Sequence, residues 1–395
     1  MKVILFVDDE NLIIRNLKNI FDDNMYEYVF KNSGVDALEY IKAHPVDLLC
    51  TDIIMPDMDG FQLLDYVKKH YPKIMRIALT DIGHPNLVRK LSLENLAQLH
   101  VFKPWNDTDL KANIIKIMKM QTALHTEEMM KMLQALDSLP TLPDIYETLV
   151  EMVSMDAPVD DIAALIEEDQ STASVILRVA NSAYYGRKTG SIHQAVMNIG
   201  LNNLKSIIIA NSVFEELTDD MGMLMDMWQH STLVNKLVTA IYSECLKKPI
   251  PGIFASAGLL HDIGKVVLYH NYEDYRNIID LASETGISIN EYEKVLFGVT
   301  HQDLGAYLLN LWGLPFAYVE SSMHHDKPMD HRIINKELVA VVHLANYYAN
   351  CYRREEEYSA DLKVYTFLKL EKDHVEKMLC DEFKWRIHDK ANNNS

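Results

Sequence analysis

Short apolar runs alternate with amphipathic stretches through the first 120 residues. Continuous apolar runs are typical of strands that are buried on both faces, and the stretches between them carry apolar residues at helical spacing. The runs predict five strands, at Val3–Val7, Tyr26–Phe30, Asp47–Thr51, Ile74–Thr80 and Leu99–Phe102. Helices are predicted at Leu12–Phe21, Val35–Ile41 and Phe61–Val67. We therefore expect an α/β, doubly wound, five-stranded parallel sheet.

After this region the pattern is helical throughout. From Asp107 to Leu136 there is neither Pro nor Gly, which predicts one helix of about 30 residues and about 45 Å. Its apolar spacing is not a clean heptad, so a plain connector and a helix that pairs two copies into a homodimer both stay open. Further helices are predicted to about residue 383, beginning with Ile145–Met155, Val159–Glu168, Thr172–Ala180, Ile192–Ile199 and Leu201–Leu217.

These patterns divide the chain into four parts. We expect an α/β domain in residues 1–121, a connecting helix in 122–137, an all-α domain in 138–345, and a helical extension with a frayed tail in 346–395. A length of 395 residues agrees with two or three domains. The hydrophobic fraction of 48% and the charged fraction of 24% are ordinary for domains with sizeable cores.

The negative charge of the chain is unevenly distributed. The net charge is −2 over residues 1–121 and −17 over the remainder. A DNA-binding domain needs clustered Lys and Arg to displace counterions from phosphates, so DNA binding is disfavoured.

The location of the chain is predicted from what its sequence lacks. No apolar run is long enough to span a bilayer, and acids directly follow the first apolar run, unlike in a secretory signal. We therefore expect a cytoplasmic protein without a membrane partner. Its four cysteines lie far apart, which predicts reduced thiols.

Acidic side chains end two of the predicted strands. Asp8 and Asp9 follow the first strand and Asp52 ends the third, so all three carboxylates converge at one edge of a parallel sheet. Two unit charges 4 Å apart repel by about 4 kcal/mol at an effective dielectric constant of 20, and a hard divalent cation relieves that repulsion. We therefore expect Mg²⁺ there. Thr80 and Lys103 bring a hydroxyl and an ammonium to the same edge, a set that suits an aspartate nucleophile forming an acyl phosphate.

Four motifs in this region resemble the receiver domain of two-component response regulators. They are VDDE at Val7–Glu10, TDIIMPDMDG at Thr51–Gly60, LTD at Leu79–Asp81 and FKPW at Phe102–Trp105. The resemblance covers residues 1 to about 121. It implies a phosphoprotein that is phosphorylated on Asp52 by a sensor histidine kinase. Alone, any one of these acids would be interpreted as a solvated loop carboxylate.

The same resemblance implies roles for other residues. Mg²⁺ ligation falls on Asp9, Asp52 and the carbonyl of Ile54, with Asp8 acting through water. The conformational switch is carried by three further residues, Thr80, Lys103 and His100. His100 stands where Tyr or Phe is most common, so this sequence departs from the family at the rotating side chain of the switch.

Histidines and one acid form a second group of candidate ligands in the helical region. The adjacent pair His261 and Asp262 can direct two ligands at one cation from a single helix, and other helices supply further imidazoles. The candidate metal-ligating residues are His230, His261, Asp262, His301, His324 and His325. Packing histidines, with Asp262 capping a turn that Gly264 permits, are the competing interpretation.

Residues 136 to about 345 resemble the HDOD domain, a relative of the HD and HD-GYP phosphohydrolases. The motifs that carry the resemblance are LPTLPD, RVANSAYYG, HDIGK, HQDLGAYLLNLWGLP and the HH pair. In the hydrolytic relatives the six candidates would ligate Fe, Mn or Zn, and Lys265 would face a phosphate. This sequence departs from those relatives in having Asn346 in place of a ligating Asp, and no GYP follows the HH pair.

The sequence thus leaves three functional hypotheses. The first is a response regulator in which phosphorylation of Asp52 switches an HDOD output that binds a downstream protein or a nucleotide. The second is a phosphorylation-regulated, metal-dependent phosphohydrolase of the HD superfamily, acting on cyclic dinucleotides. The third is a constitutive scaffold whose receiver takes no phosphate.

Overall fold

The computed structural model describes most of the chain in two compact units. The described residues are 1–81, 91, 96–135, 144–168, 170–180, 189–217, 221–251, 254, 256–272, 274–353 and 360–383. One unit comprises Met1–His125, Val150–Asp156 and Tyr307–Phe316, and the other comprises Thr126–Leu149, Ala157–Ala306 and Ala317–Ser395. Most of the LPTLPD motif and the end of RVANSAYYG lie outside the described residues.

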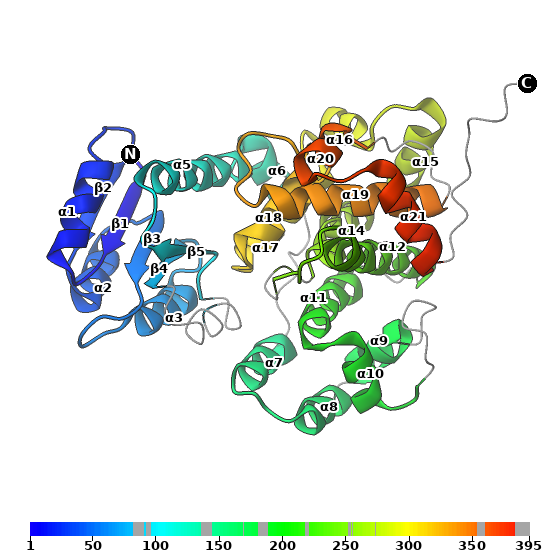
Figure 1. Ribbon diagram of the computed structural model, residues 1–395, viewed down its shortest axis with the longest axis horizontal. Helices are drawn as coiled ribbons and strands as arrows, with labels where there is room; N and C mark the ends of the chain where they lie inside the picture. The colour runs from blue at the N-terminus through cyan, green and yellow to red at the C-terminus, as the bar shows by residue number, and fades with distance from the viewer. Residues whose placement is uncertain are drawn as a thin grey trace, which may run out of the picture. The chain divides into compact units, whose positions relative to one another are not determined.

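A five-stranded parallel sheet forms the centre of the N-terminal region. Its strands are β1 (Val3–Val7), β2 (Glu27–Lys31), β3 (Leu48–Asp52), β4 (Met75–Asp81) and β5 (Leu99–Lys103), in the order β2-β1-β3-β4-β5 (Figure 1). The predicted doubly wound sheet is confirmed, and each strand begins and ends within one residue of its apolar run. Because the order reverses between β1 and β3, the carboxyl ends of these two buried strands flank the crevice where such sheets bind ligands.

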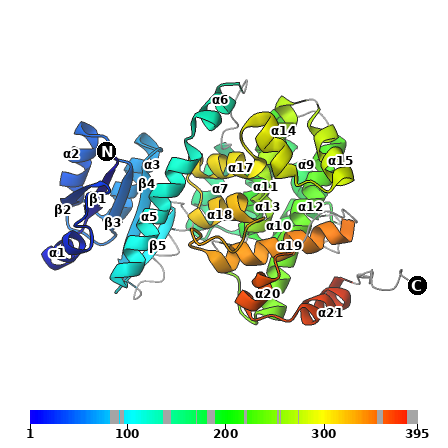
Figure 2. The same cartoon turned by 90° about the horizontal axis from the view of Figure 1, so that it is seen from above.

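Helices cover both faces of this sheet. They are α1 (Asn11–Ile20), α2 (Gly34–Ala43), α3 (Gly60–His70) and α5 (Asp107–Leu124). The helices α1 and α5 contact each other, whereas α2 and α3 pack together over the other face (Figure 2). Side chains cap three of these helices: Ser33 accepts a hydrogen bond from the Asp36 amide, Asp59 forms a capping box with Gln62, and Asn106 caps α5.

The predicted continuous helix from Asp107 to Leu136 was wrong. It is two helices, α5 and α6 (Glu127–Ala135), separated by His125 and Thr126. His125 leaves the helical conformation at φ −116° and ψ 42°, and the Thr126 hydroxyl accepts a hydrogen bond from the Met129 amide at 3.2 Å. A Thr side chain that caps a new helix offers the backbone an alternative to continuing the old one, and helical spacing does not reveal that competition.

The rest of the described chain is helical. It contains α7 (Asp144–Ser154), α8 (Val159–Glu168), α9 (Gln170–Ala180), α10 (Ile192–Ile199), α11 (Leu201–Leu217), α12 (Met221–Ala240), the π-helical turn η1 (Ile241–Cys245), α13 (Ala257–Leu260), α14 (Ile263–Asn271), α15 (Tyr275–Thr285), α16 (Ile289–Phe297), α17 (His301–Leu311), α18 (Phe316–His324), α19 (Lys336–Arg353), α20 (Lys363–Leu368) and α21 (Lys372–Phe383). No strand follows β5 in the part that the structure describes, which agrees with the predicted all-α region.

The core of the helical region lies where α12 and α19 pack against each other. Every side chain from Leu338 to Ala345 in α19 is buried. The start of α19 is anchored by Glu320 of α18, a fully buried carboxylate that accepts hydrogen bonds from the backbone amides of Ile334 and Asn335 and from the Asn335 side chain. Among the described helices, none is long and apolar enough to cross a membrane. All four cysteines are free thiols.

Candidate functional site

The carboxyl ends of β1 and β3 hold two buried carboxylates that share one cation. The ammonium of Lys103, at the end of β5, lies 2.8 Å from Asp8 Oδ2 and 2.9 Å from Asp52 Oδ1. Ligand oxygens of Asp8, Asp9 and Asp52 all lie within 4.8 Å of one another, with Asp9 more exposed than the other two. This spacing suits a single hard cation held by oxygen ligands.

Burial and the shared lysine act in opposite directions on these groups. Burial raises the pKa of Asp8 and of Asp52, and the hydrogen bonds from Lys103 offset only part of that rise. Burial lowers the pKa of Lys103, but the two carboxylates outweigh it, so the pKa of Lys103 is raised. A divalent cation would reduce the repulsion between the Asp8 and Asp52 carboxylates, as the Lys103 ammonium does.

The other predicted receiver residues lie on the neighbouring strands and on the loop after β3. Thr80 is buried near the end of β4, and Ile54 is exposed just after Asp52. His100 lies in β5, and burial lowers the pKa of its imidazole to about 4, so the ring is neutral at pH 7. The loop returns close to the strand at Gly60, where a Cβ atom would lie 2.0 Å from the Asp52 carbonyl oxygen. Gly60 therefore fixes the path of the backbone around Asp52.

A second cluster lies in the helical region and is centred on Asp262. His261 and Asp262 occupy the turn between α13 and α14, rather than a single helix as predicted. His230 comes from α12, His301 begins α17, and His325 directly follows α18. All five side chains are buried. Segments far apart in the sequence thus bring four imidazoles to one carboxylate.

The two oxygens of Asp262 face different pairs of imidazoles. Oδ2 lies 3.3 Å from His261 Nε2 and 3.7 Å from His230 Nε2. Oδ1 lies 3.4 Å from the Nε2 atoms of both His301 and His325. Each half is a triad whose ligand atoms lie within 4.8 Å of one another. A carboxylate in this position would serve both triads if each held a cation.

The far nitrogens of His261 and His325 are fixed by hydrogen bonds to backbone carbonyls. His261 Nδ1 lies 2.9 Å from the Gly258 carbonyl, and His325 Nδ1 lies 2.9 Å from the Ser322 carbonyl. A carbonyl accepts, so each Nδ1 carries the proton and each Nε2 presents its lone pair to the centre. Metal-binding histidines are characteristically oriented in this way.

His301 differs from these two rings because its Nδ1 is bound by a carboxylate. The two oxygens of Glu293, on α16, lie 2.9 and 2.8 Å from His301 Nδ1. Burial disfavours the charged imidazolium, but the Glu293 carboxylate outweighs it and raises the pKa of His301 to about 9. Burial likewise disfavours the charge of Glu293, and His301 holds the pKa of Glu293 below its usual value.

Buried polar atoms in this cluster lack conventional partners. Asp262 Oδ1, His261 Nε2 and His301 Nε2 have no hydrogen-bond partner among the described residues. Burial opposes the charge of Asp262, yet the adjacent His261 and Lys265 hold its pKa well below the usual range. Buried polar atoms left unsatisfied cost about 1–3 kcal/mol each; a cation in the His301 half would satisfy Asp262 Oδ1 and His301 Nε2, and a cation in the other half would satisfy His261 Nε2. The donor set, imidazole nitrogen and carboxylate oxygen, suits Fe, Mn or Zn.

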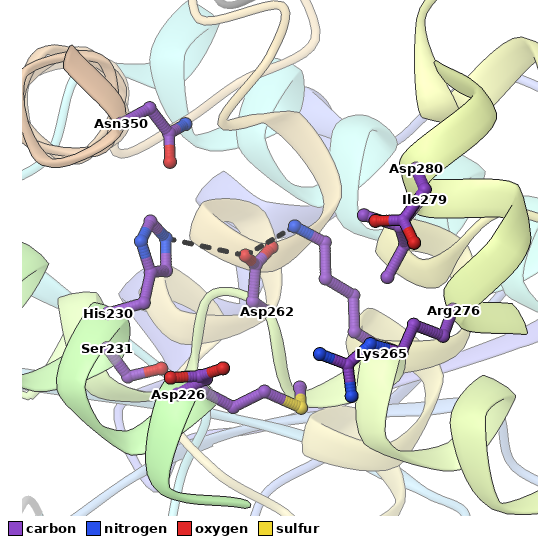
Figure 3. A pocket seen from close by; sticks show the side chains of 10 residues that line it. Asp226, His230, Ser231, Asp262, Lys265, Arg276, Ile279, Asp280 and Asn350 are labelled. Atoms are coloured by element: carbon purple, nitrogen blue, oxygen red, sulfur yellow. Dashed lines mark hydrogen bonds and ion pairs between the residues drawn. The ribbon is translucent and has the colours of Figure 1, made fainter. Parts of the chain in front are cut away.

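A cavity of about 280 Å³ opens onto this cluster (Figure 3). His230, Asp262 and Lys265 point into it, and the Lys265 ammonium lies 2.7 Å from Asp262 Oδ2. Lys265 and Arg276 give the wall two cations, while the remaining lining residues are Asp226, Met227, Ser231, Ile279, Asp280 and Asn350. The cavity thus joins a metal-type donor set to groups that bind anions.

Some predicted residues lie apart from the cluster, and some of its residues were not predicted. His324 is buried but belongs to neither triad among the described residues, and its charged neighbours include Asp330. Asn346 is buried and accepts a hydrogen bond from Asn350. Our sequence reasoning did not single out Glu293, although a Glu eight residues before a candidate His was visible. It also did not single out Asp226, which lies one helical turn before His230.

Comparison with protein families gives two matches. Residues 4–115 match the response regulator receiver domain, and residues 139–328 match the HDOD domain. An HDOD domain protein of unknown function from Geobacter sulfurreducens has a similar structure, with 24% sequence identity and a TM-score of 0.50, covering 68% of this chain and 90% of that chain. At this identity the likeness shows the fold.

Curated relatives match only parts of the chain. An uncharacterized protein of Treponema pallidum (strain Nichols) is 25% identical over 201 residues, covering 49% of this chain and 39% of that protein. The response regulator GtcR of Aneurinibacillus migulanus is 34% identical over 113 residues, covering 29% of this chain and 46% of that protein. The chain spans less than half the length of these two relatives. The chain thus has an N-terminal response regulator receiver domain followed by a C-terminal HDOD domain.

Proposed function

We propose that the chain is a phosphorylation-controlled switch in which Asp52 accepts a phosphoryl group from a sensor histidine kinase. A carboxylate oxygen of Asp52 attacks the phosphorus, the bond to the kinase histidine breaks, and an acyl phosphate forms. The observation that supports this most directly is the bridge from Lys103 to both Asp8 and Asp52 at the switch point of the sheet. The lysine provides a fixed positive charge beside the reacting oxygen.

Mg²⁺ is the cofactor of this step. Asp9, Asp52 and the carbonyl of Ile54 would hold the ion, and Asp8 would act through a bound water. The ion supplies charge neutralisation for the phosphoryl oxygens. The clustering of three carboxylates within 4.8 Å supports this assignment.

Phosphorylation then changes the charge at the end of β3. It adds about −1.5 to −2 charges, which favours movement of the Thr80 hydroxyl and of the Lys103 ammonium toward the phosphoryl group. His100, on the neighbouring strand, is the side chain that would follow Thr80. Its neutral imidazole can rotate without carrying a charge through the domain.

Acetyl phosphate with Mg²⁺ tests the phosphoacceptor. The full chain should take up one phosphoryl group per molecule, observed as a mass increase, and Asp52→Asn should abolish it. Asp57→Asn is the matched control because Asp57 is exposed on the same loop and its positive φ of 64° is tolerated by Asn. Equal labelling of Asp52→Asn and the parent would contradict the proposal and favour a constitutive scaffold.

The output of the switch is the HDOD domain, which acts by binding a downstream protein or a nucleotide. The net charge of −17 over residues 122–395 disfavours binding to DNA and to anionic membrane surfaces. We place this function in the cytoplasm. Pull-down of partners with phosphorylated and unphosphorylated chain tests it, since the partner should bind one state at least tenfold more tightly. Homodimerisation is tested by light scattering on the same two states.

A second candidate function is a metal-dependent phosphohydrolase of the HD superfamily. The convergence of four imidazoles and Asp262 at a cavity that also holds Lys265 and Arg276 supports it. Asn346 in place of a ligating Asp opposes it. Metal analysis and hydrolysis of cyclic dinucleotides test it: Asp262→Ala should lose both metal and turnover, whereas Asp161→Ala, at an exposed position of α8, should keep both. A chain that hydrolyses nothing would leave only binding as the output.

A further inference from the structure

Glu293 is a completely buried acid near the Asp262 cluster, and its hydrogen bonds with described residues come from His301 and Tyr275. Its side chain has no exposed surface. It accepts hydrogen bonds from the backbone amide of His301 at 2.8 Å, from His301 Nδ1 and from the hydroxyl of Tyr275. Tyr275 is also fully buried. These bonds fix both the start of α17 and the orientation of its first imidazole.

The direction of these bonds determines which nitrogen of His301 is available. An ionised carboxylate only accepts, so the proton on Nδ1 is directed to Glu293. The Nε2 atom is then directed at Asp262 Oδ1, 3.4 Å away, where it has no hydrogen-bond partner among the described residues. His301 thus presents a nitrogen to the centre of the cluster while its other nitrogen is held from behind.

A purely structural role would not require a charged acceptor. In the same cluster, backbone carbonyls of Gly258 and Ser322 orient His261 and His325 without any buried charge. Burying a carboxylate costs several kcal/mol, which neutral acceptors avoid. What the charge adds is electron density on the imidazole, which makes it a stronger ligand for a cation.

We propose that Glu293 is a positioning residue for a divalent metal ion in the HDOD domain, acting through His301. The proposal rests on the second candidate function only in requiring a bound metal, and it does not require hydrolysis. The carboxylate of Glu293 fixes the His301 ring and raises the affinity of Nε2 for the ion. The hydroxyl of Tyr275 helps to hold the carboxylate in place by a hydrogen bond to Oε1.

Titration of the metal-free full chain with Co²⁺, followed by visible absorption, tests the proposal. Glu293→Gln keeps one acceptor oxygen for His301 Nδ1 and removes the charge, so its affinity for Co²⁺ should fall by about 10- to 100-fold. Glu320→Gln is the matched control. Glu320 is equally buried and accepts three hydrogen bonds from Ile334 and Asn335, which belong to neither triad, so the loss of its charge should leave Co²⁺ affinity within about twofold of the parent.

A double-mutant cycle separates positioning from a general loss of structure. His301→Ala should weaken Co²⁺ binding by itself, and adding Glu293→Gln should then weaken it little further, because Glu293 acts through the ring that has been removed. Tyr275→Phe provides a milder variant that removes one bond to Glu293 and should weaken Co²⁺ binding by a smaller factor. Thermal unfolding of each variant shows which of them are folded.

The outcomes distinguish the two proposals. If the parent binds Co²⁺, His301→Ala weakens binding and Glu293→Gln does not, the role of Glu293 is overturned while the metal site stands. Additive losses in the double-mutant cycle also overturn it. If the parent binds no Co²⁺, or if His261→Ala and His301→Ala both bind as the parent does, the metal site itself fails and takes the role of Glu293 with it.

Discussion

The ammonium of Lys265 lies 2.7 Å from Oδ2 of Asp262, one helical turn away. The same oxygen faces the imidazoles of His230 and His261. The Lys265 ammonium therefore occupies the position at Asp262 Oδ2 that a metal cation bound by His230 and His261 would also contact. Burial disfavours the charge on Lys265, but Asp262 outweighs it and raises the pKa of Lys265. The lysine is therefore charged, and it would compete with a metal cation for this oxygen.

Replacement of this lysine should strengthen metal binding. In Lys265→Met the competing ammonium is gone while the aliphatic length is kept, so Co²⁺ affinity should rise by about tenfold, the size of one charge-assisted hydrogen bond. Lys248→Met is the control, since it removes a half-exposed ion pair with Glu337 and should leave Co²⁺ affinity unchanged. An affinity that falls in Lys265→Met would mean that the lysine helps to hold the ion.

Removal of the receiver lysine should make the stability of that domain depend on Mg²⁺. In Lys103→Met, Asp8 and Asp52 lose the cation they share, which should lower the free energy of unfolding by about 2–3 kcal/mol in EDTA. Mg²⁺ should restore more stability in the variant than it adds to the parent. Lys69→Met removes an exposed pair with Asp65 and should cost less than about 0.5 kcal/mol with or without Mg²⁺. Equal Mg²⁺ responses would contradict this prediction.

A single methyl group at Gly264 should disrupt the Asp262 cluster. A Cβ atom there would lie 1.9 Å from the carbonyl oxygen of His301 and 2.6 Å from the Gly305 amide nitrogen, and neither backbone atom can move aside cheaply. Gly264→Ala should force α14 and α17 apart, lower the free energy of unfolding by about 2 kcal/mol or more, and weaken Co²⁺ binding. Gly190→Ala, with no atom within 4 Å of its Cβ, should change stability by less than about 0.5 kcal/mol. Similar losses in both variants would argue against close helix contact as the cause.

The acid stability of the receiver should depend on Asp23. The hydrogen bond from Lys111 is the main cause that lowers the pKa of Asp23 from its usual value of 3.8 to about 2. Because the folded pKa lies below the unfolded one, the stabilisation is fully present above about pH 4 and is lost as the pH falls toward 2.

Urea unfolding as a function of pH checks this. Asp23→Asn should be less stable than the parent by under about 1 kcal/mol at pH 7, and the difference should shrink between pH 4 and pH 2. Asp22→Asn, at the exposed neighbouring position, should follow the parent at every pH. A difference that stays constant down to pH 2 would exclude Asp23 as its source.

Much of the receiver follows from local sequence alone. The neighbouring strands β1 and β3 are buried on both faces, so their apolar runs mark their ends to within one residue, and an acid that follows β1 must lie near an acid that ends β3. The break after α5 was missed because helical spacing continues across it. The helix breaks there because the Thr126 hydroxyl caps α6. This contact depends on one side chain rather than on a repeated pattern.

In the helical region, the spacing of residues in the sequence does not identify which side chains face Asp262. A histidine pair such as His324 and His325 cannot be resolved by spacing, because adjacent residues at a helix end point in different directions and only the packing decides which one faces Asp262. Glu293 was missed for a related reason. It lies in an amphipathic helix of ordinary composition, and the partners that surround it, His301 of α17 and Tyr275 of α15, come from other helices.

The division of Asp262 between two pairs of rings has a consequence for how ions would load. The Asp262 carboxylate carries a single negative charge, and the first cation to bind at either oxygen would neutralise most of that charge. A second cation would then meet a carboxylate whose negative charge is already partly neutralised, and the first cation would repel it. Occupancy of the two halves should therefore be sequential, with a tight first step and a weak second one, so that the concentration of free metal sets how many ions the cluster holds.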